Sequence, residues 1–295
     1  MSVDKIISGN LDREMAEPVV RLAETIRAQH GPESLAILVY GSCLRGTPPT
    51  DSLIDYYVLT ETTRAISGNP LSRALCRLVP PNVYYTEDTI GDVTYRAKHA
   101  ALTLDAFRGK VAETTSNPYF WARFAQPVAM AYCRDETARQ EVIAALETAV
   151  RTMFAKISPL SGDDAETAIL WERGLSATYA SELRSEGPGR AQQRVDADRD
   201  YYEAVTQAIR TGDVNRASSL TAEQDWARVR RNGKLLSIAR LLKAAFTFRG
   251  GADYLAWKIS RHSGQPVDLT HWQRRHPILA ALTLLPKLLK SGAVK

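Results

Sequence analysis

Two neighbouring stretches decide the fold: Leu38-Val39-Tyr40-Gly41-Ser42 and Asp51-Ser52-Leu53-Ile54-Asp55-Tyr56-Tyr57-Val58-Leu59. An unbroken apolar run leads into the first stretch and predicts a buried strand over residues 34–40. The Pro- and Thr-containing segment 47–50 indicates a turn, and the Tyr- and Val-rich segment 54–60 predicts a second strand. An acidic residue, Asp55, lies near the start of that second strand. We therefore expect a strand, a Gly-Ser turn and an acid-bearing strand to stand next to one another.

The flanking sequence predicts a mixture of helices and strands. Apolar residues at helical spacing predict a helix over residues 11–29. A strand pair is predicted over 82–86 and 92–98, joined by a turn at 88–91. Helical patterns dominate after Leu104. Helices are predicted over residues 138–156, 164–185, 198–211, 233–248 and 252–262.

These elements predict an α+β fold in three regions. Residues 1–132 are expected to form a domain with a mixed sheet and flanking helices, and 133–215 a helical domain. Residues 216–295 are expected to form a basic helical region that ends in an amphipathic segment. The chain has 295 residues and is 44% hydrophobic, which is enough to bury a real core.

Cysteine usage and the N-terminus bear on the cellular compartment. Cys43, Cys76 and Cys133 are far apart and odd in number, so they predict neither a disulfide framework nor a zinc site. We expect a reducing compartment. The N-terminal residues do not have the layout of a signal peptide, and no apolar run reaches the roughly 18 residues that a membrane-spanning helix needs.

The charge is unevenly distributed along the chain. Residues 215–295 contain 15 Lys or Arg and 4 Asp or Glu, a net charge of +11, whereas the whole chain carries +5 and residues 1–214 therefore carry −6. Such a basic region favours a polyanionic partner, either an anionic membrane or a nucleic acid. A solvated basic face without a partner is the alternative.

The Gly-Ser turn is suited to binding phosphate. Gly41 lacks a Cβ, so the backbone there can bend sharply and approach a phosphate closely. Ser42 offers a backbone N–H and a hydroxyl, and Arg45 could neutralise phosphate charge. If residues 43–46 open a helix, its first amides add to the anion site. Most Gly-Ser pairs that follow a strand are ordinary turns.

Asp55 strengthens the hypothesis of a phosphate site. A carboxylate inside an apolar strand costs several kcal/mol unless it is paired or bound to a metal. Mg²⁺ in phosphoryl-transfer sites is held by one or two carboxylates together with substrate phosphates. Strand alternation puts Asp51 on the same face as Asp55 if the strand begins early enough to include it. The alternatives are a strand-end carboxylate for Asp55 and a turn residue for Asp51.

At these residues the chain resembles the DNA polymerase β-type nucleotidyltransferase superfamily. That superfamily has Gly-Ser after one strand and an Asp-x-Asp pair at the start of the next. Here Leu53 stands in place of the first aspartate, and only Asp55 remains. This departure argues against the branches that modify antibiotics and nucleic acids.

One branch of the superfamily is more similar, the mitochondrial-type phosphatidate cytidylyltransferases of the translocator assembly and maintenance family. Tyr40-Gly41-Ser42 and Leu53-Ile54-Asp55 match its motifs. The segments 93–98 and 120–128 are similar to a strand with a basic/Tyr pair and to an aromatic–Ala-Gly-Arg–Pro-Val segment of that family. The resemblance covers residues 35–130, with a looser similarity over 258–277. Two departures are Ala122 before Arg123 and Cys43 after the Gly-Ser pair.

The resemblance implies transfer of CMP from CTP to phosphatidate, giving CDP-diacylglycerol and pyrophosphate, with Mg²⁺ as cofactor. It implies that residues 1–132 form a nucleotidyltransferase domain. The implied catalytic residues are Asp55, Lys98 and Arg123. The implied metal ligands are Asp55, Asp51 and a third carboxylate, for which Glu87 is favoured over Asp88 and Asp105. The implied substrate-binding residues are Tyr40, Gly41, Ser42, Arg45 and Arg96, while surface charge is the alternative for Arg96, Lys98 and Arg123.

The C-terminal segment is expected to lie on a membrane. Residues 278–290 are apolar with basic flanks and too short to span a bilayer, which suits a helix in the headgroup plane. The membrane-contacting residues predicted there are Trp272, Arg274, Arg275, Leu284, Leu285 and Lys287. A core helix is the alternative. For the Leu-rich helix at 233–248, which also carries Lys234, Arg240 and Lys243, we expect core packing to explain the leucines.

Three functional hypotheses follow from the sequence. The first is a cytidylyltransferase for phosphatidate, peripheral on the inner, cytoplasmic face of a membrane or on the matrix side of a mitochondrial membrane, with no stable nucleic-acid partner. The second is a nucleotidyltransferase for another acceptor, which the missing second aspartate disfavours. The third is a non-catalytic protein that keeps the fold and binds a membrane or nucleic acid through its basic region.

Overall fold

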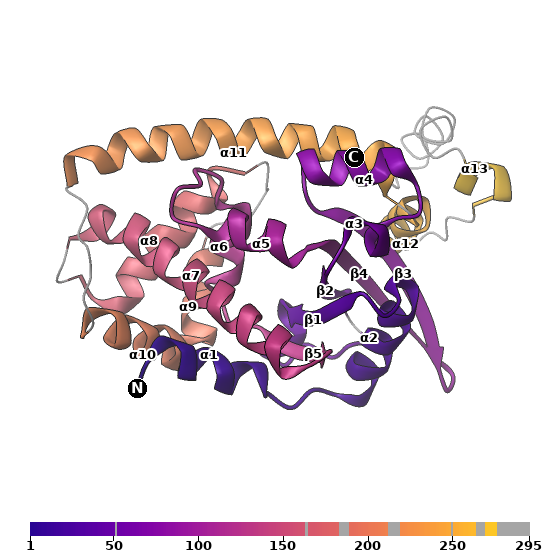
Figure 1. Ribbon diagram of the computed structural model, residues 1–295, viewed down its shortest axis with the longest axis horizontal. Coiled ribbons are helices and arrows are strands. Elements are labelled where there is room, and N and C mark those ends of the chain that lie inside the picture. The colour runs from indigo at the N-terminus through magenta and orange to yellow at the C-terminus, as the bar shows by residue number, and fades with distance from the viewer. Residues whose placement is uncertain are drawn as a thin grey trace.

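The α+β class is confirmed by the computed structural model, in which a mixed five-stranded sheet is flanked by helices (Figure 1). The structure describes residues 1–50, 52–162, 165–182, 189–211, 219–248, 250–263 and 269–275. The strands are β1 (Ser34–Tyr40), β2 (Ile54–Thr60), β3 (Asn82–Ile90), β4 (Val93–Thr103) and β5 (Ala129–Cys133). Their order is β3-β4-β2-β1-β5, with β2 and β4 parallel and the other pairs antiparallel.

Two of the strands lie where the sequence predicted them, and the other three differ. β1 and β2 have the expected bounds, because unbroken apolar runs between turn residues mark buried strands well. β3 and β4 extend further than predicted, and their turn lies at 91–92 rather than 88–91, with Gly91 at φ 63°. β5 is a short edge strand that the sequence pattern did not predict.

The helices at the N-terminus correct the predicted helix over 11–29. Two helices form there, α1 (Val3–Leu11) and α2 (Glu17–His30), and a Pro in the first turn of α2 starts the second one. The remaining helical elements are the 3-10 turn η1 (Ser42–Arg45) and the helices α3 (Thr63–Ile66), α4 (Pro70–Leu78), α5 (Leu104–Val111), α6 (Pro118–Phe124), α7 (Glu136–Ser161), α8 (Thr167–Tyr179), α9 (Arg190–Ala197), α10 (Arg199–Arg210), α11 (Ser219–Thr247), α12 (Gly251–Ser263) and α13 (His271–Arg275).

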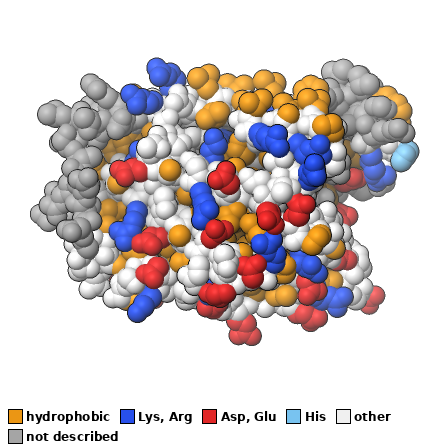
Figure 2. All heavy atoms as spheres, in the orientation of Figure 1, with side chains coloured by type: hydrophobic (Ala, Val, Ile, Leu, Met, Phe, Trp, Pro, Cys, Tyr) orange, Lys and Arg blue, Asp and Glu red, His pale blue; other side chains and the backbone are white. Residues whose placement is uncertain are grey.

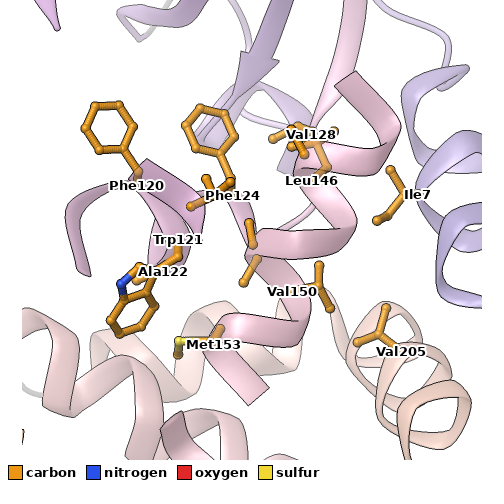
Figure 3. Close-up of a cluster of buried hydrophobic side chains, with 14 of the residues drawn as sticks. Ile7, Phe120, Trp121, Ala122, Phe124, Val128, Leu146, Val150, Met153 and Val205 are labelled. Atoms are coloured by element: carbon orange, nitrogen blue, oxygen red, sulfur yellow. The ribbon is translucent and has the colours of Figure 1, made fainter. Parts of the chain in front are cut away.

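The sheet has a hydrophobic core on each face. Alternate residues of β1 and β2 point to opposite sides. On one side Ile37 and Val58 pack with residues of α2. On the other side Leu38 and Tyr57 join a larger core that includes residues of α1 and α5 to α11. Figure 3 shows the buried aromatic residues of α6 beside α7.

The larger core runs through the predicted boundary between residues 132 and 133. It contains Val128 before that boundary and Leu146, Val150 and Met153 of α7 after it. The sheet and the first helices of the second region therefore share one apolar interior, which fixes α6 and α7 relative to the sheet. The three-region division of the chain stays a prediction.

Helix α11 corrects the prediction that its leucines pack in the core. Leu235, Leu241 and Leu242 are exposed, whereas Lys243 is only 7% exposed. Lys243 donates to the carbonyl oxygens of Val79 and Pro81 and to Asn82 Oδ1. The cationic side chain therefore turns inward and the leucines turn outward. Figure 2 shows hydrophobic side chains gathered along α11 and α4.

The predicted membrane segment is described only in part. Trp272 of α13 is half-exposed, and Arg274 forms an ion pair with Asp253, with 2.8 Å between Nε and Oδ1. Arg275 ends α13, and Leu284, Leu285 and Lys287 lie outside the described residues. Within the part of the chain that the structure describes, no helix is both long enough and apolar enough to cross a bilayer.

Candidate functional site

Three predicted site residues form a row across the sheet. Tyr40 at the end of β1 is the register partner of Asp55 on β2, and Asp55 is the register partner of Lys98 on β4. Register partners on neighbouring strands point to the same face of a sheet. The Lys98 Nζ atom lies 3.0 Å from Asp55 Oδ1. The Asp55 carboxylate raises the pKa of Lys98 above its usual value, so Lys98 is positively charged at neutral pH.

Gly41 lets the chain pass close to Asp55. Its φ is 95°, in the left-handed region that favours glycine. A Cβ at this position would lie 3.4 Å from Asp55 Oδ2. The residues after Gly41 form a single 3-10 turn rather than the longer helix that would present an N-terminal anion site. Burial raises the pKa of the Cys43 thiol to about 11, so this thiol is protonated at neutral pH.

Arg123 reaches the row from α6. Its Nη1 donates to the Tyr40 hydroxyl at 3.2 Å, and its guanidinium carbon lies 5.3 Å from the centre of the Tyr40 ring. Asn117 caps α6 by accepting from the N–H of Tyr119. The fully buried Phe120 and Trp121 anchor the helix in the core. Packing of α6 therefore places Arg123 beside the strand row.

These residues line one cavity of about 620 Å³, a size within the usual range of ligand pockets. The predicted site residues among its walls are Tyr40, Gly41, Ser42, Arg45, Asp55, Lys98 and Arg123. The structure therefore brings together residues from the Gly-Ser turn, two strands and α6. Their positions in the sequence are far apart, and the shared cavity is a consequence of the fold.

The far wall of the cavity was not predicted. Arg190, Gln193 and Arg194 of α9 line it. The i, i+4 spacing of Arg190 and Arg194 puts both on one helix face, and this spacing is visible in the sequence. Nothing in the sequence pattern places that face in the same cavity as Asp55.

The cavity is strongly cationic. Its described lining carries five cations, Arg45, Lys98, Arg123, Arg190 and Arg194, and one carboxylate, Asp55. Arg45 pairs with Asp198 at 2.9 Å just outside the lining. Arg194 donates to Gln126 Oε1 at 3.2 Å, and its Nε is buried without a hydrogen-bond partner within the described residues. A multiply charged anion complements such a cavity.

Two predicted site residues lie elsewhere on the sheet. Arg96 Nε and Glu87 Oε1 form an ion pair at 3.0 Å. Glu87 is on β3, which is separated from the Asp55 strand by β4. Of the other carboxylates considered, Asp88 accepts a hydrogen bond from Thr25 at 2.6 Å, and Asp105 lies in the first turn of α5. Asp51 lies outside the described residues.

The donor set restricts how a metal ion could bind. Among the described residues, no group of three or more His, Cys, Asp or Glu side chains is arranged to hold a metal ion. Asp55 supplies one carboxylate to the cavity. One carboxylate fits a Mg²⁺ ion that takes its other ligands from substrate phosphates and water. It does not fit a metal cage built from protein side chains.

Comparison with known proteins adds a distant structural similarity. No protein-family model matches the sequence, and no curated protein matches it. Among solved structures, the chain is similar to a nucleotidyltransferase-like protein from Exiguobacterium sibiricum 255-15. The two are 12% identical, with 93% of this chain and 92% of that chain covered and a TM-score of 0.28. A similarity at this level says nothing about what this chain binds.

Proposed function

We propose that this protein is a cytidylyltransferase that transfers CMP from CTP to phosphatidate at a membrane surface, with Mg²⁺ as cofactor. The products are CDP-diacylglycerol and pyrophosphate. One observation carries the proposal: the motifs on which the resemblance to phosphatidate cytidylyltransferases rests line a single cationic cavity. The acceptor and the base of the nucleotide come from that resemblance alone.

The proposed reaction needs positioning and charge neutralisation more than a strong base. A phosphate monoester is already nucleophilic near neutral pH. An oxygen of the phosphatidate phosphate would bond to the α-phosphorus of CTP. At the same time the bond between that phosphorus and the oxygen shared by the α- and β-phosphates would break. Pyrophosphate would leave with the electron pair of the broken bond. The arrangement of cations around a transferring phosphoryl group is a main source of rate enhancement in such reactions.

The residues of the cavity divide this work. Gly41 and Ser42 would hold the β- and γ-phosphates, because both residues line the cavity and the turn passes close to Asp55. Arg190 and Arg194 of α9 line the same cavity and would add positive charge for the phosphates. Lys98 and Arg123 would neutralise charge at the α-phosphate and on the incoming phosphate.

Asp55 is the residue that would hold Mg²⁺. Bound there, the ion would supply positive charge that stabilises the pyrophosphate leaving group. The ion pair with Lys98 holds the Asp55 carboxylate in place at the cavity wall. A phosphate that binds beside this ion pair would then meet one cation and one metal ligand.

The test is product formation from CTP, Mg²⁺ and vesicles that contain phosphatidate. We expect CDP-diacylglycerol and pyrophosphate in equal amounts, and loss of about 10²–10³-fold in kcat for Asp55→Asn. The variant Glu87→Gln is the matched control, because its carboxylate is paired with Arg96 outside the cavity. Absence of product with folded protein over several phospholipid acceptors would overturn the proposal.

A non-catalytic role is the second candidate, and one observation favours it. Asp55 is already neutralised by Lys98, and it is the single carboxylate in the described lining of the cavity. An anion-binding protein without turnover would bind CTP with the same affinity whether Mg²⁺ is present or not. Binding of CTP that does not depend on Mg²⁺, without formation of CDP-diacylglycerol, would select this candidate.

A further inference from the structure

A second cavity, of about 410 Å³, is lined by residues of α6, β3, α11 and α12. Its walls are mainly apolar and aromatic, and include Val83, Leu241, Ala244, Phe248 and Tyr254. Burial of apolar ligand surface is the main driving force for binding in such a cavity. The phosphate-binding chemistry described above does not use it.

Tyr119 lines the apolar cavity, and its ring contacts one arginine of each cavity. Arg123 lines the cationic cavity, and its guanidinium carbon lies 4.6 Å from the centre of the Tyr119 ring. Arg240 lines the apolar cavity, and its guanidinium carbon lies 3.8 Å from the same ring centre. One aromatic ring is therefore in contact with a cation from each cavity. A ligand that passes Tyr119 would meet both guanidinium groups.

Arg240 has hydrogen-bonding capacity left over. Its Nε donates to the carbonyl oxygen of Pro80 at 3.2 Å, and its Nη1 is buried without a hydrogen-bond partner within the described residues. A buried donor without a partner is costly. Lys243 differs, because its ammonium group is occupied by backbone and Asn82 oxygens. The described lining holds two cations, Arg240 and Lys243, and one carboxylate, Glu182, so its net charge is positive.

The mouth of the apolar cavity opens onto the exposed face of α11. Leu241 lines the cavity and is 64% exposed, so it lies at the rim. Leu235, Ile238 and Leu242 continue the exposed apolar face along the helix. An acyl chain could move from an apolar surface into the cavity without crossing water.

We infer that this apolar cavity holds an acyl chain of the phospholipid acceptor, which enters past Leu241, and that Arg240 Nη1 binds the phosphate of that lipid. The phosphate then lies near Tyr119, whose ring also contacts Arg123 of the nucleotide cavity. Arg and phosphate form strong charge-assisted hydrogen bonds, and this pairing supplies the missing partner of Nη1. The inference rests on the proposed function for the identity of the acceptor.

The test is direct binding of a lysophosphatidate whose polyene acyl chain is fluorescent, measured on the full chain below the micelle concentration and without CTP. We expect saturable binding of one molecule per chain. Ala244→Trp fills the cavity and should weaken binding about ten-fold. Arg240→Gln should weaken the binding of lysophosphatidate about ten-fold. It should change the affinity for a monoacylglycerol with the same acyl chain by less than about two-fold.

Leu241→Glu and Leu242→Glu form a matched pair of variants. The two leucines are neighbours with exposures of 64% and 65%, but of the two only Leu241 lines the cavity. Both variants add the same charge to the exposed face, and neither removes a buried side chain. We expect about ten-fold weaker binding for Leu241→Glu and a change within about two-fold for Leu242→Glu. Equal effects of the two variants, or no saturable binding to the unaltered protein, would overturn the inference.

Failure of this inference can be told apart from failure of the proposed function. If CDP-diacylglycerol forms and Leu241→Glu and Ala244→Trp leave the KM for long-chain phosphatidate unchanged, the cavity assignment is wrong and the function stands. If lysophosphatidate binds as described and no CDP-diacylglycerol forms, the function is wrong and the lipid cavity stands.

Discussion

Gly41 lines the cationic cavity and has a backbone conformation that favours glycine. We predict that Gly41→Ala costs about 1–2 kcal/mol of stability, because an L-residue is strained at a φ of 95°. Relief of this strain should also shift the turn that carries Ser42 and raise the KM for CTP, because the new Cβ itself would only be in ordinary van der Waals contact with Asp55 Oδ2, at 3.4 Å. Urea unfolding measures the first effect, and the KM for CTP measures the second.

Gly9→Ala is the control for that prediction. Gly9 is an exposed residue of α1, its φ is not left-handed, and no atom lies within 4 Å of where a Cβ would stand. This variant should stabilise the protein by about 0.5–1 kcal/mol, because alanine loses less entropy in a helix. A neutral Gly41→Ala variant with unchanged KM would contradict the role given to Gly41.

The buried pair His30 and His99 should make the free energy of unfolding depend on pH. Their Nε2 atoms are 3.0 Å apart in the core, and burial lowers the pKa of both side chains below the usual 6.5. As pH falls below about 6.5, the unfolded chain therefore binds more protons than the folded one, and stability falls. Stability from this pair is complete above that pH.

The slope should approach about 1.4 kcal/mol per pH unit for each histidine. Urea unfolding at several pH values from about 7 to about 5 measures it. His99→Gln is the comparison variant and should remove part of the slope. Stability that rises on acidification over this range would contradict the assignment of two neutral histidines.

At the scale of the element, α11 is the helix for which periodicity was misleading. A helical repeat identifies an apolar face but does not say whether that face meets the core. Here Lys243 donates to three oxygen atoms at and just before the start of β3, so the polar face of the helix turns inward. The short strand β5 was missed for a related reason: its pairing with β1 depends on tertiary contacts that a five-residue pattern does not reveal.

The orientation of α11, with its leucines exposed and Lys243 buried, leads to a prediction about the free energy of unfolding. Leu242→Gln should change the free energy of unfolding by less than about 0.5 kcal/mol, because the side chain is exposed. Lys243→Met should cost about 1–3 kcal/mol, because it leaves buried oxygen acceptors without a donor. Urea unfolding of the two variants decides the matter, and a larger loss for Leu242→Gln would restore the core-packing prediction.

At the scale of the whole molecule, the site combines what sequence motifs predict with what only packing supplies. Tyr40, Asp55 and Lys98 were grouped in advance by the family resemblance, and the strand register that makes them neighbours comes from the structure. The cations of α9 could not be grouped with them in advance, because their position depends on the core that joins α7, α8 and α9 to one face of the sheet. The lipid cavity likewise requires α11 to be laid against β3.

The most direct test of the central claim is a calorimetric titration of CTP with Mg²⁺ into the full chain. We predict saturable binding of one CTP per chain, weakened about ten-fold by Arg194→Gln, because Arg194 is a cation that lines the same cavity as Asp55. Arg151→Gln, which removes an exposed cation of α7 paired with Glu147, should leave the affinity unchanged. The absence of CTP binding, or equal affinity in all three proteins, would contradict a nucleotide site in this cavity.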